Sequence, residues 1–249
     1  NVTKAAMVLI GAAAAQWETE PEQSDAEEAE TQADPALRRV SRAALGAFAE
    51  FLSRPDAFAV LAFVVLFKFT DAFSGTMTAP FVIDLGFTRN DYAAIVKGVG
   101  LAATLIGGFA GGFLARRYSL TASLWFGALL QALSNLAFAW LSTVGVNQWA
   151  LALAISVENF TGAIGTVIFV AYLSALCQNP LHTATQYALL TALAAIGRTY
   201  MAAGAGYVAE AAGWPAFFAI SVAVALPSLA LLAYLQRRGH FARLGPIRV

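Results

Sequence analysis

Charged residues and cysteine are both scarce in this chain of 249 residues. Only 12% of the residues are Asp, Glu, Lys or Arg, whereas soluble domains average about 25%. Cys177 is the one cysteine, which excludes an internal disulfide framework. Basic and acidic residues balance at 15 each, and no basic patch is dense enough to predict nucleic-acid binding. An ordinary soluble domain is therefore a poor interpretation.

Long apolar stretches stand where the charges are missing. Apolar residues make up 59% of the chain, and the mean hydropathy is +0.66. Residues 118–157 and 159–197 contain no Asp, Glu, Lys or Arg, and a helix needs only about 20 mostly apolar residues to cross a bilayer. The strands of a membrane β-barrel would instead alternate apolar and polar residues. The sequence therefore predicts an all-α integral membrane protein.

Six membrane-spanning helices are predicted between short turns rich in Gly, Asn and Pro. The predicted spans are Ala57–Ile83, Asp91–Ala115, Leu120–Thr143, Gln148–Leu176, Thr183–Glu210 and Trp214–Gln236. They form a six-helix transmembrane bundle at residues 55–236, followed by a basic cytoplasmic tail at 237–249. Lys and Arg are concentrated before the first span, after the second and after the sixth, and an excess of these residues marks cytoplasmic loops. Both ends of the bundle are therefore expected in the cytoplasm.

The residues before the first span have a different composition. Residues 1–17 contain the apolar run "AAMVLIGAAAA", which is too short to span a bilayer. We interpret it as the end of a truncated upstream helix, with a signal-peptide remnant as the alternative. Residues 18–54 begin as an acidic stretch typical of a disordered linker and end as a basic amphipathic segment typical of the cytoplasmic membrane surface. The chain is thus expected to be the C-terminal piece of a longer protein.

Small residues recur every three or four positions in the second span. They are Gly100, Thr104, Gly107, Gly108, Gly111 and Gly112. This spacing places them along one stripe of the helix, where a neighbouring backbone can approach closely. Static packing and helix sliding during a transport cycle both fit such a stripe.

Five charged residues lie inside the predicted spans. They are Lys68, Asp71, Lys97, Glu158 and Arg198. A charge at the centre of a membrane helix costs about 2.5–3.5 kcal/mol, so these side chains should face one another or a watery cavity. Lys68 and Asp71 are three residues apart on one helix and can pair directly. The polar side chains of Asn135, Asn159 and Gln186 are also placed within the spans. Together these residues predict a solute pathway with proton or ion coupling.

Two other classes of function remain as alternatives. A membrane enzyme would need a nucleophile, base and acid in a recognisable set, and no such set is evident. No His, Cys or carboxylate spacing suggests a metal, so neither a metal nor a cofactor is predicted. A scaffold or receptor that transports nothing is the second alternative.

Several motifs resemble those of the major facilitator superfamily. The loop "GGFLARRYSL" (111–120) is similar to the cytoplasmic loop signature G-x-L-A-D-R-x-G of that superfamily, with Arg116 in place of the Asp. More specific similarity is to its muropeptide permease (AmpG-type) branch. That similarity is carried by "FKFTDAF" (67–73), "KGVGLAATLIGGFAGG" (97–112), "LQALSNLAF" (130–138), "ENFTGAIGT" (158–166), "TATQYALLTALAAIGR" (183–198) and "GWPAFF" (213–218).

The resemblance implies a twelve-helix transporter of which this chain holds the C-terminal half. It implies proton-driven import of anhydromuropeptides across the bacterial inner membrane, with the missing N-terminal half, the solute, protons and the lipid bilayer as partners. On this hypothesis Arg198 and Lys97 hold a substrate carboxylate, while Glu158 or Asp71 takes up a proton. The polar side chains Asn135, Asn159 and Gln186 would bond sugar hydroxyls and amides. A major-facilitator transporter of another solute, such as a coenzyme-A thioester, a sugar or a drug, is the alternative.

Overall fold

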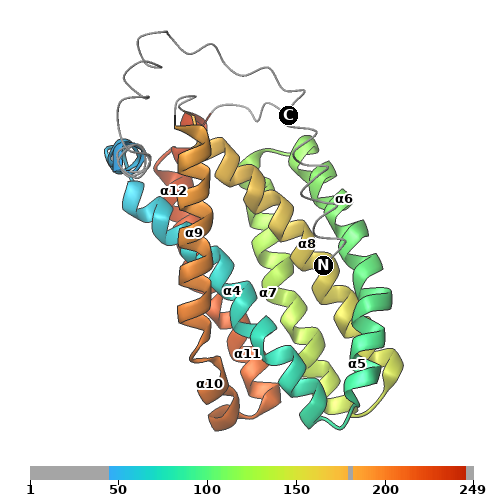
Figure 1. Ribbon diagram of the computed structural model, residues 1–249. Helices are drawn as coiled ribbons and strands as arrows, with labels where there is room; N and C mark the ends of the chain where they lie inside the picture. Colours follow the sequence, from blue (N-terminus) through green and yellow to red (C-terminus); the bar gives the residue numbers. More distant parts are fainter. Residues whose placement is uncertain (1–44, 179–181, 245–249) are drawn as a thin grey trace, which may run out of the picture. The chain divides into compact units, whose positions relative to one another are not determined.

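The computed structural model describes residues 45–178 and 182–244, in which all regular secondary structure is helical (Figure 1). The predictions for residues 1–17 and for the acidic linker lie outside the described residues. A helix at residues 45–52 occupies the end of the predicted amphipathic segment. The described part of the chain thus confirms the predicted all-α fold.

The six predicted spans all appear as helices long and apolar enough to cross a membrane. They consist of α4 (Ala57–Asp84), α5 to α6 (Arg89–Ile95 and Leu101–Arg117, joined by a π-helix η1 at Val96–Gly100), α7 (Leu120–Val144), α8 (Gln148–Leu176), α9 and α10 (Thr183–Ala202 and Ala205–Ala212), and α11 and α12 (Trp214–Val224 and Leu226–Arg237). A short helix, α13 (His240–Arg243), follows. The predicted ends lie within a few residues of the observed ones.

Three spans are interrupted, whereas the sequence predicted each span as one continuous helix. The second contains the π-helical segment η1, and the fifth is broken between α9 and α10, where Gly204 lies. The sixth is broken at Ala225, because Pro227 in the next turn has no backbone N–H to continue the helical hydrogen bonds. These interruptions divide long apolar segments into shorter helices.

Polar side chains and glycines fix where the spans begin and end. Thr88 and Asp91 form a capping box at the start of α5, and the side chain of Asn147 accepts hydrogen bonds from two backbone N–H groups of α8. Gly145 ends α7 with φ of 79°, and Gly213 stands between α10 and α11 with φ of 75°. A side chain would strain the backbone at both glycines. The short turns that result make consecutive spans antiparallel.

The spans pack around α4 and α8 (Figure 1). The helix α8 contacts both α6 and α7, while α4 packs along α9 and also touches α11 and α12. We call the end of the bundle with Arg54, Arg117 and Arg237 the basic end, and the opposite end the far end. At the far end the indole N–H of Trp214 donates to Asp84 over 2.6 Å.

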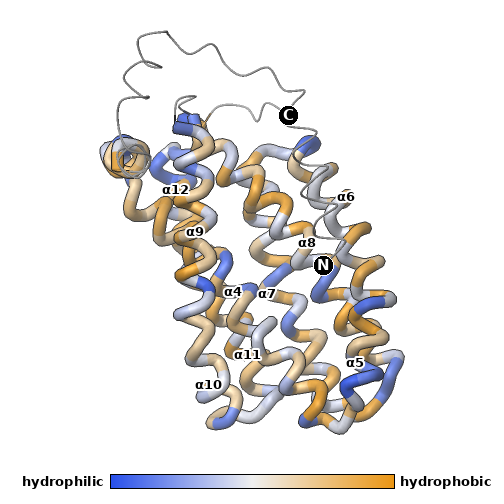
Figure 2. Tube along the Cα trace, in the orientation of Figure 1, coloured by the Kyte–Doolittle hydropathy of each residue, from blue (hydrophilic) through white to orange (hydrophobic). Residues whose placement is uncertain are grey.

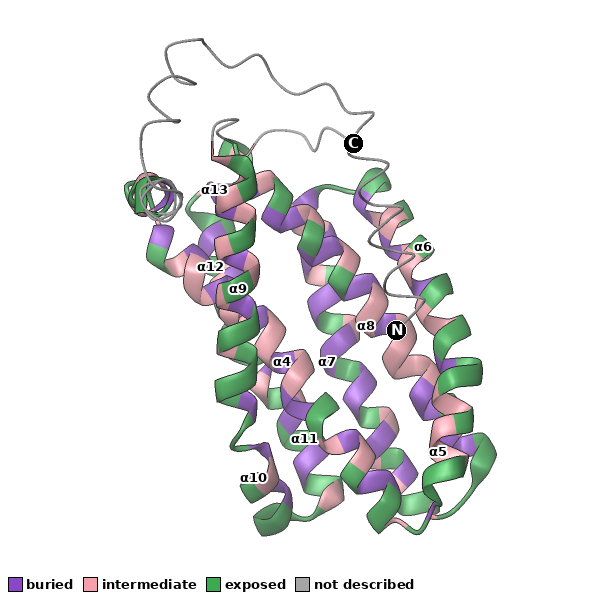
Figure 3. Ribbon diagram, in the orientation of Figure 1, coloured by how far each residue is buried: buried purple, intermediate pink, exposed green. Residues whose placement is uncertain are grey.

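The glycine stripe of the second span divides into a packed and an open part. A Cβ at Gly107 would lie less than 3 Å from the carbonyl oxygen of Phe160, and one at Gly111 would lie 3.0 Å from Cα of Ile164. Next to them, a Cβ at Gly108 would meet no atom within 4 Å. Elsewhere α6 is largely exposed (Figure 3). The stripe thus allows the close approach of α6 and α8.

Two apolar clusters fill the bundle, and polar residues separate them. Phe67 and Tyr172 belong to the cluster toward the basic end, and Phe81 and Phe218 belong to the cluster toward the far end. Between the buried members of the two clusters, every span except the second carries polar residues (Figure 2). We call these residues the polar layer: Lys68, Thr70, Asp71, Gln131, Ser134, Asn135, Glu158, Asn159, Thr161, Arg198, Ser221 and Ser228.

Candidate functional site

Lys68 and Asp71 form the predicted ion pair in the polar layer. Nζ of Lys68 lies 3.6 Å from Oδ2 of Asp71 and donates a hydrogen bond of 2.9 Å to Oγ1 of Thr166 on α8. It also lies 5.5 Å from the ring centroid of Phe169, a distance at which a cation is attracted by an aromatic face. The Lys68 side chain is 14% exposed and that of Asp71 is 34% exposed. The carboxylate is therefore the more accessible partner.

Glu158 faces α4 from the middle of α8. Oγ1 of Thr78 donates to Oε1 of Glu158 over 3.4 Å, and a Cβ at Gly75 would lie 4.0 Å from the same oxygen. The side chain of Asn159, next along α8, accepts a hydrogen bond of 3.1 Å from Thr104 of α6. Glycine and threonine therefore leave room beside the Glu158 carboxylate while α4, α6 and α8 remain in contact.

A cavity of about 510 Å³ lies against these residues. We call it the α8 cavity. It is lined by Asp71, Gly75, Thr78, Tyr92, Val96, Thr104, Gly108, Ile155, Glu158, Asn159, Gly162, Ala163, Thr166 and Val167. The volume lies in the range of ligand-binding pockets, about 300–1,000 Å³. Two carboxylates and several neutral hydroxyl and amide groups therefore share one hollow at mid-bundle.

A second cavity of about 560 Å³ lies next to the first, between α4 and α9. We call it the α9 cavity. Its lining residues are Asp71, Ala72, Gly75, Thr76, Met77, Arg198, Thr199, Ala202 and Ala203. Arg198 is exposed on α9 and is the cation of this lining. The two cavities share Asp71 and Gly75.

The structure brings five of the eight predicted site residues to this region and places three elsewhere. Lys68, Asp71, Glu158, Asn159 and Arg198 lie at or beside the two cavities. Lys97 is exposed in η1 and lines neither cavity. Asn135 is buried on α7 and also lines neither. Gln186 lies near the basic end, where its side chain is engaged with other residues.

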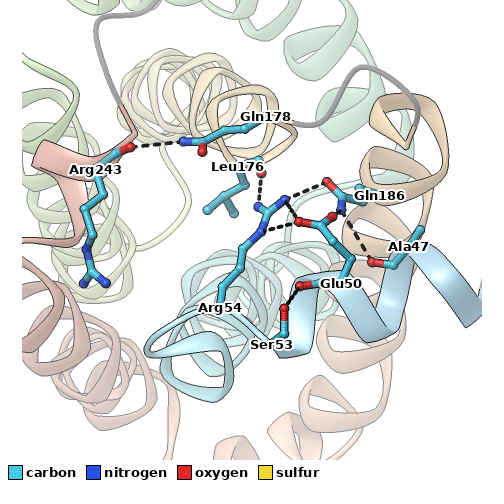
Figure 4. A network of polar contacts seen from close by, with 8 residues as sticks. All are labelled: Ala47, Glu50, Ser53, Arg54, Leu176, Gln178, Gln186 and Arg243. Carbon is cyan, nitrogen blue, oxygen red and sulfur yellow. Dashed lines mark hydrogen bonds and ion pairs between the residues drawn. The ribbon is translucent and has the colours of Figure 1, made fainter.

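Gln186 belongs to a polar network that joins the helix at 45–52 to the bundle (Figure 4). Its Nε2 donates to the carboxylate of Glu50 and, over 3.4 Å, to the carbonyl of Ala47. Arg54 pairs with Glu50 at 2.8 Å and donates to the carbonyl of Leu176 at the end of α8. The network therefore connects the segment before α4 with α8 and α9.

A second set of ion pairs lies at the basic end beside this network. Asp56 precedes α4 with φ of 63°, and its carboxylate pairs with Arg238 at 3.2 Å and with Arg243 at 2.9 Å. The hydrogen bond from Arg243 is the main reason that the pKa of Asp56 lies below its usual value. Buried His240 lies 3.1 Å from the hydroxyl of Tyr172. Burial, reinforced by Arg243, lowers the pKa of His240 to about 4.

The sequence did not identify several residues that complete the α8 cavity. Thr78, Tyr92 and Thr166 contribute hydroxyl groups to its lining, and Gly162 leaves space at 3.9 Å from Oδ1 of Asp71. Helical spacing offered a signal, because Gly162 and Thr166 follow Glu158 by four and eight residues on α8. Tyr92 gave no such signal, because it lies on another span.

Comparison with known proteins shows the family of this chain. The Major Facilitator Superfamily matches residues 4–200. The chain is 37% identical to the anhydromuropeptide permease of Escherichia coli K12 over 210 residues, which are 84% of this chain and 43% of the permease. It is also 37% identical to the AmpG 4 protein of Rickettsia felis over 196 residues, which are 79% of this chain and 47% of that protein. The chain therefore spans about half the length of these relatives. With most of its length matched, this multi-pass membrane chain belongs to the major facilitator superfamily.

Proposed function

We propose that this chain forms the six-helix C-terminal half of a proton-driven importer of anhydromuropeptides in the bacterial inner membrane. The observation that carries the proposal is the 37% identity to a protein named anhydromuropeptide permease, combined with two cavities at the polar layer. The concentration of Lys and Arg at the basic end supports a cytoplasmic position for that end. A further six-helix half would complete the protein.

The charges around the cavities suit an anionic, polyhydroxylated solute. Anhydromuropeptides carry carboxylates on their peptide and hydroxyl and amide groups on their sugars. Arg198 offers a guanidinium that can bind a carboxylate with two hydrogen bonds, and Asn159 with the nearby threonines offers partners for hydroxyl groups. Lys97 and Asn135 have no part in this proposal, because they line neither cavity. Lys68 also lines neither, but it is paired with Asp71, which lines both.

The Lys68–Asp71 pair gives a physical route to coupling. A proton on Asp71 would cancel the carboxylate charge that now faces Lys68 at 3.6 Å. Lys68 would then be a cation without a charged partner and would attract a solute carboxylate more strongly. Because binding linkage is reciprocal, the bound anion would strengthen proton binding by the same factor. Glu158, the other carboxylate of the α8 cavity, is the second candidate proton carrier.

Uptake into membrane vesicles tests this proposal. Vesicles containing the full-length protein should accumulate labelled anhydromuropeptide when an inward proton gradient is imposed. Asp71→Asn or Glu158→Gln should abolish the accumulation driven by the gradient and leave exchange of bound solute at equilibrium. Glu210→Gln is the matched control, because Glu210 is an exposed acid of α10 that lines neither cavity.

The outcomes separate the proposal from its alternatives. Accumulation at the wild-type level in both Asp71→Asn and Glu158→Gln would refute the proposed role of the two acids in proton coupling. Uptake of a coenzyme-A thioester, a sugar or a drug without uptake of the muropeptide would favour another solute. Hydrolysis of the muropeptide by the purified protein would favour an enzyme. The absence of any solute or proton flux would leave a scaffold or receptor.

A further inference from the structure

Asp71 and Gly75 are the residues shared by the linings of the two cavities. Both lie on α4, which lines one cavity together with α8 and the other together with α9. The two residues are one helical turn apart and therefore lie on the same side of α4. Gly75 is exposed, so α4 has a notch, with no side chain, at the point where the two cavities meet.

The space at Gly75 is bounded by the Glu158 carboxylate. A Cβ at Gly75 would be in contact range of Oε1 of Glu158, at 4.0 Å, and would meet no nearer atom outside its own helix. A single methyl group thus fits, whereas a large side chain would extend across the notch or press on Glu158. A large group at this position would therefore lie between the two cavities.

The two cavities differ in their chemistry. Besides the carboxylates of Asp71 and Glu158, the lining of the α8 cavity includes Tyr92, Thr104 and Asn159. The hydroxyl and amide groups of these three residues suit the hydroxyl and acetamido groups of sugars, which carboxylates can also accept as hydrogen-bond donors. The α9 cavity contains the cation Arg198 together with Asp71, two threonines and apolar residues. The guanidinium of Arg198 suits a carboxylate on a short peptide. Such a division matches a solute with a glycan at one end and an anionic peptide at the other.

We infer that one solute occupies both cavities at once, with its glycan in the α8 cavity and its anionic peptide in the α9 cavity. Gly75 is then the specificity-determining residue, because the solute crosses α4 at this position. This inference rests on the proposed function, because it assigns the parts of the anhydromuropeptide. Gly75 contributes to specificity by leaving space. A solute with only one of the two parts occupies one cavity and does not cross the notch.

A thiol introduced at the notch tests this arrangement in the folded protein. Gly75→Cys is made in a Cys177→Ala background of the full-length protein, so that no other thiol of this chain reacts. The thiol is converted to a mixed disulfide with methyl or with benzyl methanethiosulfonate, and dithiothreitol reverses the reaction. Gly98→Cys is the matched control, because a Cβ there would meet nothing within 4 Å and Gly98 lines neither cavity.

The expected results depend on the size of the added group. The unmodified Gly75→Cys thiol should retain uptake of the anhydromuropeptide within about twofold, whereas the benzyl adduct should reduce it by about tenfold or more. The methyl adduct, which is about the size of a methionine side chain, should have an effect between these two. Dithiothreitol should restore uptake, which shows that the protein stayed folded. Neither adduct of Gly98→Cys should alter uptake by more than about twofold. Equal uptake by the unmodified thiol and the benzyl adduct of Gly75→Cys would overturn the inference.

Protection of the thiol gives a second readout that does not require transport by the variant. The whole anhydromuropeptide should slow alkylation of Gly75→Cys by about tenfold, while the free disaccharide or the free peptide should slow it by less than about twofold. Equal protection by the whole solute and by either fragment would overturn the inference. Absence of anhydromuropeptide uptake by the wild-type protein would instead refute the proposed function, so the two failures are distinguishable.

Discussion

Gly107 offers the sharpest test of how the bundle is packed. In Gly107→Ala the new methyl group would lie less than 3.0 Å from the carbonyl oxygen of Phe160 and 3.0 Å from Cβ of Ala163. Ordinary contacts of this kind begin at 3.4 Å, so α6 would have to move away from α8 by at least the 0.4 Å between these limits. The obstacle is backbone on α8, which cannot rotate aside as a flexible side chain would.

The size of the effect follows from the behaviour of overpacked cores. One extra methylene in a filled site destabilises a protein by about 1–3 kcal/mol, and each kcal/mol lowers the melting temperature by about 2–4 °C for a unit of roughly 150–250 residues. Gly108→Ala is the matched control, because its Cβ meets no atom within 4 Å. Both substitutions change helix propensity in the same direction, so the difference between them isolates the contact with α8.

Thermal unfolding of the full-length protein in detergent measures this difference. We expect Gly107→Ala to unfold several degrees below Gly108→Ala, and Gly108→Ala to unfold at or above the temperature of the wild-type protein. Equal melting temperatures for the two variants would refute the reasoning, because they would mean that α6 and α8 are not in contact at Gly107.

Three further predictions concern single side chains. Asp56→Asn should lower the melting temperature at pH 7, because the carboxylate that binds two arginines is lost. The folded-state pKa of Asp56 is depressed. The difference in melting temperature from the wild type should therefore vanish as the pH falls through that pKa. With a folded-state pKa of about 4 for His240 against about 6.5 when unfolded, protons favour the unfolded chain between these values. Stability should therefore fall more steeply from pH 6.5 to 4 in the wild type than in His240→Gln; parallel pH profiles would contradict this. Nε2 of Gln131 is buried and has no hydrogen-bond partner in the described part of the chain. Gln131→Met should therefore leave the melting temperature unchanged or raise it. A clear drop in the melting temperature would show that the amide has a partner.

Hydropathy was sufficient to predict the spans, because the thickness of a bilayer sets helix length whatever the details of packing. The pairing of Lys68 and Asp71 was also predictable, since it depends only on their spacing along one helix, and the structure confirms it at 3.6 Å. The break at Ala225 could have been read from Pro227. The π-helix η1 could not, because its glycines also fit an ordinary membrane helix.

Contacts between helices set the limit of the sequence interpretation. Gln186 was predicted to bond the solute because it is polar and lies in an apolar segment, yet its amide contacts Glu50 and Ala47, which precede the first span. Asn135 is buried on α7, and α7 contributes no residue to the lining of either cavity. The depth of a residue follows from its position along a span. The face that it presents depends on how its helix is rotated against its neighbours.

The ion pairs of the two regions differ in how firmly they are held. The carboxylate of Asp56 is 6% exposed and binds two arginines at 2.9 and 3.2 Å, whereas that of Asp71 is 34% exposed and faces one lysine at 3.6 Å. Both arginines of Asp56 are themselves exposed, at 58% and 42%, but two partners at shorter distances hold that carboxylate from two directions. Water or a solute can more readily replace the single, more distant partner of Asp71. The closely held pairs therefore suit a permanent connection at the basic end. The looser pair at the cavities suits a group that exchanges its partner during a transport cycle.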